Sequence, residues 1–132
     1  MKNIIIFLFT LFVSGSVFSQ QKETVNVKEF RKGIKQENSI ILDVRTPEEY
    51  AEGHLRNSLN VNWKNQEEFK ARAAQLDKTK ALYVYCRSGV RSEKASEWLR
   101  MNGFNHVKDL NGGIQAWKKA GKRLSKNKHQ AQ

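Results

Sequence analysis

One cysteine, Cys86, lies between an apolar run and a loop that contains two arginines. The loop reads Cys86-Arg87-Ser88-Gly89-Val90-Arg91. The run before it, 81–85, has the composition of a buried strand, and residues 90–101 after it show helical spacing of apolar positions. The thiol is therefore predicted at a helix N-terminus, where free backbone amides, the helix dipole and both guanidinium groups favour the thiolate. Because a structural core cysteine has no use for two flanking arginines, the pattern indicates a reactive thiol.

The elements that must position this loop alternate along the chain. Short apolar runs predict strands at 40–44, 58–61, 82–85 and 106–110. Longer stretches with helical periodicity predict helices at 27–35, 47–52, 66–76, 90–101 and 114–120. Strands and helices in alternation are typical of an α/β domain with a mainly parallel sheet.

Two of the predicted strands end in residues that can carry chemistry. One ends in Asp43-Val44-Arg45, and the other delivers Cys86-Arg87. Ligands of parallel sheets bind beyond the carboxyl ends of the strands. We therefore expect these two segments to line the same ligand-binding opening, here called the mouth.

Local signals mark several helix boundaries. Thr46 followed by Pro47 predicts an N-cap and a first-turn proline. Gly53, Gly103 and Gly121 each follow a predicted helix, where left-handed caps are expected.

The first 19 residues have the features of a secretory signal. Lys2 gives a positive start, residues 4–13 are apolar apart from one threonine, and Val17 and Ser19 stand at positions −3 and −1 of a cleavage site after Ser19. The strongly apolar part falls short of the roughly 20 residues that span a bilayer. We therefore expect a periplasmic or otherwise exported protein without an integral membrane segment after cleavage; an uncleaved anchor is the alternative.

The rest of the chain fits one domain, expected at 20–122, followed by a basic, disordered tail at 123–132. The net charge is +11. Export and the lack of aromatic residues among the lysines argue against a nucleic-acid partner, which leaves a solvated basic surface or weak attraction to anionic lipid or an acidic partner. A lone thiol in a compartment that favours disulfides indicates that the thiol is used.

Three blocks of the sequence resemble the single-domain rhodaneses, a family of sulfurtransferases. The blocks are Leu42-Asp43-Val44-Arg45-Thr46-Pro47-Glu48-Glu49-Tyr50-Ala51-Glu52-Gly53-His54-Leu55, Tyr85-Cys86-Arg87-Ser88-Gly89-Val90-Arg91-Ser92 and Leu110-Asn111-Gly112-Gly113-Ile114-Gln115-Ala116-Trp117. They follow the family's order and spacing, and the likeness covers about 25–122. One departure is Asn57, where the family usually has glycine; asparagine tolerates a left-handed conformation better than most residues.

The resemblance implies a rhodanese-like fold, with a five-stranded, mainly parallel sheet and helices on both faces. It also implies that the six-residue loop curls round the sulfur of Cys86, so that the amides of Arg87 to Arg91 form an anion nest. The Cys86 thiolate would take a sulfane sulfur from thiosulfate or a persulfide donor and pass it to a thiophilic acceptor, which can be a protein. This chemistry requires no metal and no organic cofactor.

The arginines of the loop have two interpretations. Arg87 and Arg91 would attract an anionic donor, or either would pair with Glu93 or Asp43. Ser88, Gly89 and Val90 complete the expected substrate-binding loop, in which Gly89 permits the turn.

Asp43 and Arg45 are expected to support the site rather than react, with Arg45 pairing to Glu49 four residues on. His54 follows a glycine in a predicted turn and is expected to hydrogen-bond the backbone instead of acting as a base. The other two histidines show no ligand spacing with Cys86, so no metal site is predicted.

Two other functions compete with sulfur transfer. The domain could be a sulfur carrier or binding module that serves a partner protein without turning over by itself. Phosphatases that share this fold have a cysteine, five residues and an arginine; here Ser92 occupies that position and Arg91 comes one residue early. Arsenate reduction would also want a resolving thiol, and the chain has no second cysteine.

Overall fold

The structure is a computed structural model that describes residues 23–126; the predicted signal at 1–19 lies outside this range. Its centre is a parallel five-stranded sheet of order β1-β5-β4-β2-β3. The strands are β1 (Thr24–Val25), β2 (Ser39–Asp43), β3 (Leu59–Asn60), β4 (Ala81–Tyr85) and β5 (Val107–Leu110). Four of them lie where apolar runs predict strands, whereas β1 is too short to give a periodic signal.

Within residues 23–126, four helices connect the strands and a fifth follows β5. They are α1 (Val27–Ile34), α2 (Pro47–Glu52), α3 (Gln66–Ala73), α4 (Val90–Met101) and α5 (Gly113–Lys119). The bounds of α2 and α4 are those predicted. Helix α3 ends three residues before the prediction, at Ala73, and α5 begins one residue early, at Gly113.

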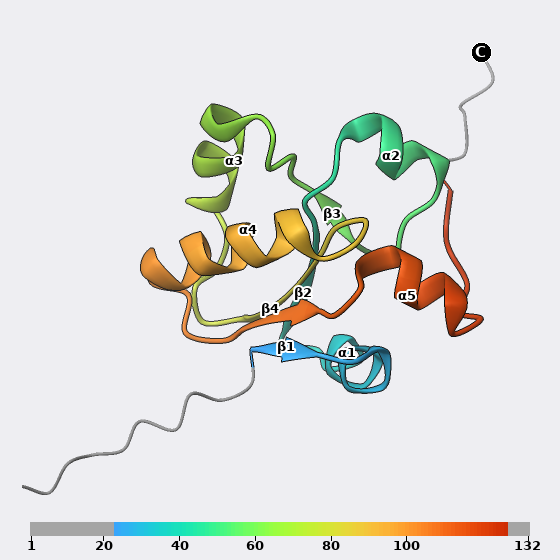
Figure 1. Ribbon diagram of the computed structural model, residues 1–132. Coiled ribbons are helices and arrows are strands. Elements are labelled where there is room, and N and C mark those ends of the chain that lie inside the picture. Colours follow the sequence, from blue (N-terminus) through green and yellow to red (C-terminus); the bar gives the residue numbers. More distant parts are fainter. Residues whose placement is uncertain (1–22, 127–132) are drawn as a thin grey trace, which may run out of the picture.

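Helices cover both faces of the sheet (Figure 1), as the resemblance implies. On one face α3 and α4 pack through Phe69, Ala95 and Leu99 onto buried strand residues such as Leu42 and Val84. On the other face α1 and α5 form a second core, which contains Phe30, Ile114, Trp117 and the buried Tyr85. Burial on both faces explains why the central strands are nearly continuous apolar runs.

The predicted boundary of α2 is confirmed. Thr46 is the N-cap of α2 and forms a capping box with Glu49, and Pro47 lies in the first turn. Gly103 and Gly121 have left-handed φ angles of 95° and 73°, as expected. The expectation for Gly53 is wrong, since its φ of 161° is extended backbone. A Cβ at position 53 would lie 3.2 Å from Leu124 Cδ1, so glycine is suited to this position by its close packing against Leu124.

The predicted disordered tail begins too early. Ser125 forms an antiparallel bridge with His54, through N···O distances of 2.9 and 2.7 Å. Trp117 Nε1 donates a hydrogen bond to Arg123 O at 3.1 Å, and Leu124 packs against the core beside α5. The folded domain therefore extends at least to Ser125, and residues 127–132 of the predicted tail lie outside the described residues. Within residues 23–126, no helix is long and apolar enough to cross a membrane.

Candidate functional site

Cys86 directly follows β4, and its side chain is buried at the N-terminus of α4. The Gly89 amide donates a hydrogen bond to Cys86 Sγ at 3.1 Å. Gly89 is the N-cap of α4 and has a left-handed φ of 110°, which a residue with a side chain rarely adopts. The Ser92 hydroxyl and the Glu93 amide both donate to Gly89 O, at 3.2 and 3.0 Å. The first turn of α4 thereby fixes the amide that contacts the sulfur.

The back of the loop is held by α5. The amides of Ile114 and Gln115 donate to the carbonyl oxygens of Cys86 and Arg87, at 2.9 and 3.2 Å. Gly113 makes this approach possible, because a Cβ there would lie 2.5 Å from both carbonyl oxygens. With these carbonyls turned toward α5, the opposite side of the loop is left for amides that face the sulfur. Of the amides expected to do so, the structure shows that of Gly89 bonded to Sγ.

Gly113 is the positioning residue that sequence reasoning left without a role. Its signal was the pair Gly112-Gly113 directly after a strand, since two adjacent glycines there indicate a close backbone approach. Both have left-handed φ angles, of 74° and 58°.

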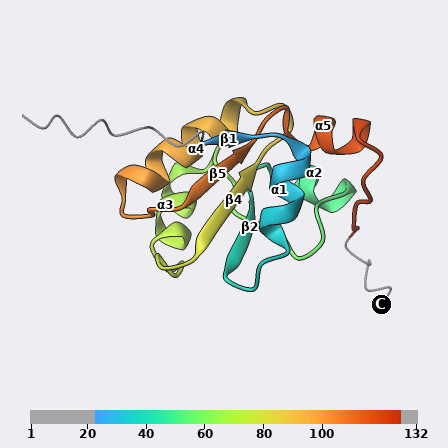
Figure 2. The ribbon, with the colours of Figure 1, turned by 90° about the horizontal axis from the view of Figure 1, so that it is seen from below.

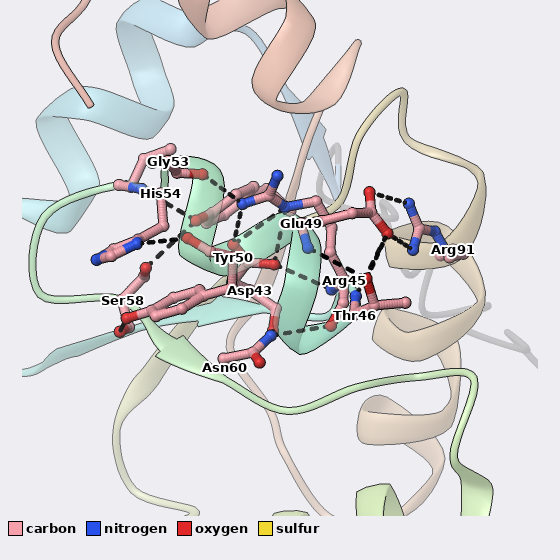
Figure 3. Close-up of polar contacts among 12 residues, drawn as sticks. Asp43, Arg45, Thr46, Glu49, Tyr50, Gly53, His54, Ser58, Asn60 and Arg91 are labelled. Carbon is pink, nitrogen blue, oxygen red and sulfur yellow. Dashed lines mark hydrogen bonds and ion pairs between the residues drawn. The ribbon is translucent and has the colours of Figure 1, made fainter. Parts of the chain in front are cut away.

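Arg91 is engaged by α2. Its Nη1 and Nη2 donate to Glu49 Oε1 and Oε2 at 2.7 and 2.9 Å (Figure 3). This bidentate pair lowers the pKa of Glu49 to about 2 and raises that of Arg91. The expected pairing of Arg45 with Glu49 is therefore wrong, and so are the alternative partners Glu93 and Asp43 for Arg91. Arg91 links the first turn of α4 to α2, and its two terminal nitrogens bond to Glu49.

Asp43 and Arg45 form a buried pair beneath the loop. Arg45 Nη2 donates to Asp43 Oδ2 at 2.7 Å and to Gly53 O at 2.8 Å (Figure 3). Asp43 is paired with Tyr85 in the β2–β4 register, so the two strand ends share one mouth as predicted. The Arg45 guanidinium also lies 5.6 Å from the centre of the Tyr85 ring. Both charged groups are fully engaged, which agrees with a supporting role.

Tyr85, the residue before Cys86, is anchored at its hydroxyl. Tyr85 Oη accepts a hydrogen bond from the Leu55 amide at 3.0 Å and lies 3.2 Å from Ser58 Oγ. Burial raises the pKa of Tyr85, so the phenol stays neutral. His54 Nδ1 lies 2.8 Å from Tyr50 O and its ring stacks on that of Tyr50, so the backbone contact expected for His54 is confirmed.

Arg87 is exposed at the edge of the loop. It lines a cavity of about 230 Å³ together with Gln115 and Lys118 of α5 and with Arg45 and Glu49. Within residues 23–126, neither Arg87 nor Lys118 forms an ion pair, in contrast to Arg45 and Arg91. Ser88 and Val90 lie on the outer side of the loop, where they line a second cavity of about 230 Å³.

Comparison with known proteins identifies relatives of this arrangement. The profile of the Rhodanese-like domain matches residues 26–120. YqhL of Bacillus subtilis, an uncharacterized protein, is 31% identical over 123 residues, which cover 89% of this chain and 94% of YqhL. A tRNA uridine(34) hydroxylase of Pelagibacter ubique is 36% identical over 102 residues, or 77% of this chain; the match spans only 34% of that hydroxylase.

The solved structure of a rhodanese-related protein from Thermoplasma volcanium has the same fold. It is 33% identical, with a TM-score of 0.68, and the match covers 78% of this chain and 97% of that protein. The family profile, the two relatives and the solved structure each match most of this chain. The chain belongs to the Rhodanese-like domain family.

Proposed function

We propose that this protein is a sulfurtransferase that carries sulfane sulfur as a persulfide on Cys86. The observation that carries the proposal is the hydrogen bond from the Gly89 amide to Cys86 Sγ at the N-terminus of α4. An amide and the positive end of a helix stabilise a sulfur anion, whether thiolate or persulfide, without a proton acceptor.

The reaction has two displacement steps. The Cys86 thiolate attacks the outer sulfur of thiosulfate, the S–S bond of the donor breaks, and its electron pair leaves with sulfite. A nucleophilic acceptor then attacks the outer sulfur of the persulfide, and the Cys86 thiolate is restored. Neither step changes the number of protons on the protein, so the proposed reaction requires no general base.

Arg87 and Lys118 would attract the anionic donor. Their side chains lack ion-pair partners in residues 23–126 and line the same cavity beside the loop. The Gln115 side chain in this cavity adds a neutral donor. Arg91 would act by holding α4 against α2, because Glu49 already occupies its two terminal nitrogens.

The relatives suggest a wider context. The tRNA uridine(34) hydroxylases are about three times as long as the segment that they share with this chain, so their named activity belongs to larger proteins. A protein acceptor and an exported location, with residues 1–19 as a cleaved signal, remain part of the proposal. The carrier reading differs from the enzyme reading only in whether thiosulfate loads Cys86 by itself.

Intact mass spectrometry of the full chain tests the proposal. Incubation with thiosulfate should add one sulfur, about 32 Da, which cyanide removes and which Cys86→Ser never shows. Loading by a persulfide donor but not by thiosulfate would favour the carrier. If neither donor adds sulfur to the folded protein, the proposal is wrong.

A further inference from the structure

A cavity separate from the mouth lies between α4 and the side of the sheet that holds β1 and β5. Its volume is about 320 Å³. In Figures 1 and 2, β1 and β5 run side by side next to α4. The residues that line it are Glu23, Thr24, Glu93, Ser96, Glu97, Arg100, Met101 and Asp109. Nothing in the sulfur-transfer chemistry uses this cavity.

Two buried side chains in this cavity have polar atoms without partners. Asp109 is 4% exposed and Ser96 is fully buried. Asp109 Oδ1 and Ser96 Oγ have no hydrogen-bond partner among the described residues. An unpaired buried polar atom costs roughly 1–3 kcal/mol, and more if it is charged, so a ligand that pairs with both atoms recovers that energy.

Arg100, the arginine that lines this cavity, bonds to other groups. Arg100 Nη1 pairs with Glu23 Oε2 at 2.9 Å, and its Nη2 donates to Val107 O at 3.2 Å. Glu93 and Glu97 lie on the α4 side of the cavity and form no ion pair in residues 23–126. The cavity is therefore a negative site in a chain whose net charge is +11.

The electrostatics around Asp109 also favour a cation as the ligand. The pKa of Asp109 is raised to about 6: burial is the largest cause, Ser92 and Arg100 oppose the rise, and nearby Glu93 adds to it. A cation bound beside Oδ1 would favour the carboxylate and lower this pKa.

We propose that this cavity binds an alkylammonium group. An ammonium carries three N–H donors, which match Asp109 Oδ1, Ser96 Oγ and a rim carboxylate, and its methylene stem can lie along Met101. Within residues 23–126, no group of three histidine, cysteine or acidic side chains can hold a metal ion, which favours an organic cation. The ammonium belongs either to a free polyamine or to a lysine side chain of another protein.

An ammonium bound in this cavity would lie close to the cysteine loop. The cavity lined by Ser88, Gly89 and Val90 shares Thr24, Glu93 and Asp109 with this one. Binding an ammonium there is independent of whether Cys86 transfers sulfur.

The test is a calorimetric titration of the full chain with spermidine, 1-propylamine and an acetylated lysine amide, with 1-propanol as the neutral analogue. We expect saturable binding of amines only, strengthening as pH rises through about 6 because Asp109 ionises. Asp109→Asn should weaken binding at least about tenfold, whereas Glu67→Gln, which removes one exposed charge from α3, should leave it unchanged. Tighter spermidine binding would identify a polyamine as the source, and tighter lysine-amide binding a protein.

A second measurement covers the case in which Asp109→Asn fails to fold. The NMR shift of the Asp109 carboxyl carbon in the unmodified protein should titrate at lower pH when an amine is added. The proposal is overturned if that shift does not respond, if 1-propanol binds as well as 1-propylamine, or if Asp109→Asn and Glu67→Gln have equal effects.

Discussion

The two sides of the cysteine loop are held by different means. Toward α5 the contacts are between backbone atoms, and they leave no room for a Cβ at Gly113. Toward α2 they are ion pairs between side chains, Arg91 with Glu49 and, beneath it, Arg45 with Asp43. The comparison teaches that the charges which hold this side are paired, whereas Arg87 and Lys118 form no ion pair within residues 23–126.

Replacing Gly113 by alanine should have the largest effect. The new Cβ would meet the carbonyl oxygens of Cys86 and Arg87 at 2.5 Å, so α5 and the loop must separate. We expect sulfur loading to fall below one-hundredth, about 3 kcal/mol in the barrier. Loading rate by mass spectrometry and the unfolding midpoint in urea measure the two consequences.

Gly121→Ala is the matched control. Gly121 also has a left-handed φ, of 73°, but among residues 23–126 no atom beyond its chain neighbours lies within 4 Å of its Cβ position. This variant should lose only the roughly 1–2 kcal/mol of left-handed strain and keep its loading rate. Equal damage from both substitutions would show that the close approach at Gly113 does not matter.

Asp43→Asn breaks the ion-pair side. It leaves the Arg45 guanidinium buried without its carboxylate, a change that costs about 3–5 kcal/mol for buried pairs. The free energy of unfolding from urea titration measures the loss. A value below about 1 kcal/mol, as for exposed ion pairs, would contradict the supporting role of Asp43.

Substitutions of Arg87 and of Arg91, which is paired with Glu49, should change different measured quantities. Arg87→Gln should raise the KM for thiosulfate by about 5–10-fold with little change in stability, because it removes a charge that has no ion-pair partner within residues 23–126 and that lines the cavity beside the loop. Arg91→Gln should instead lower the melting temperature, because it releases Glu49. The reverse result would make Arg91 the residue that meets the donor.

The pH dependence of stability should show two opposed contributions. The pKa of Glu49 is lowered to about 2, so its stabilising contribution is complete above about 4.5 and is lost as pH falls toward 2. The pKa of Asp109 is raised to about 6, so its contribution is complete below about 4 and is lost as pH rises through 6. Urea midpoints measured between pH 2 and 8 report both changes in stability. Glu49→Gln should remove the loss of stability at low pH, and Asp109→Asn should remove the loss of stability near pH 6. If either variant keeps the pH dependence of the unmodified protein, that dependence does not come from the substituted residue.

Much of the fold follows from local patterns in the sequence. Helices α2 and α4 begin where predicted because the features at their starts, Thr46-Pro47 and the Gly89 turn, are local. The shared mouth also follows, since parallel strands bring Asp43 and Cys86 to one edge.

The partners of the charged residues could not be predicted. Glu49 lies four residues from Arg45, which favours a helical pair, but Arg91, 42 residues away, takes it because tertiary packing brings α4 beside α2. The bridge from Ser125 to His54 was missed for the same reason, since a lysine-rich sequence gives no sign of a contact so distant in the chain.

The strand order has a consequence for solubility. Both edge strands, β1 and β3, are two residues long, whereas the five-residue strands β2 and β4 lie inside the sheet. An exposed edge strand presents unpaired amides and carbonyls that can pair with another chain, and a short edge strand presents few of them. We therefore expect this protein to resist association by strand addition, so that any partner meets it through side chains.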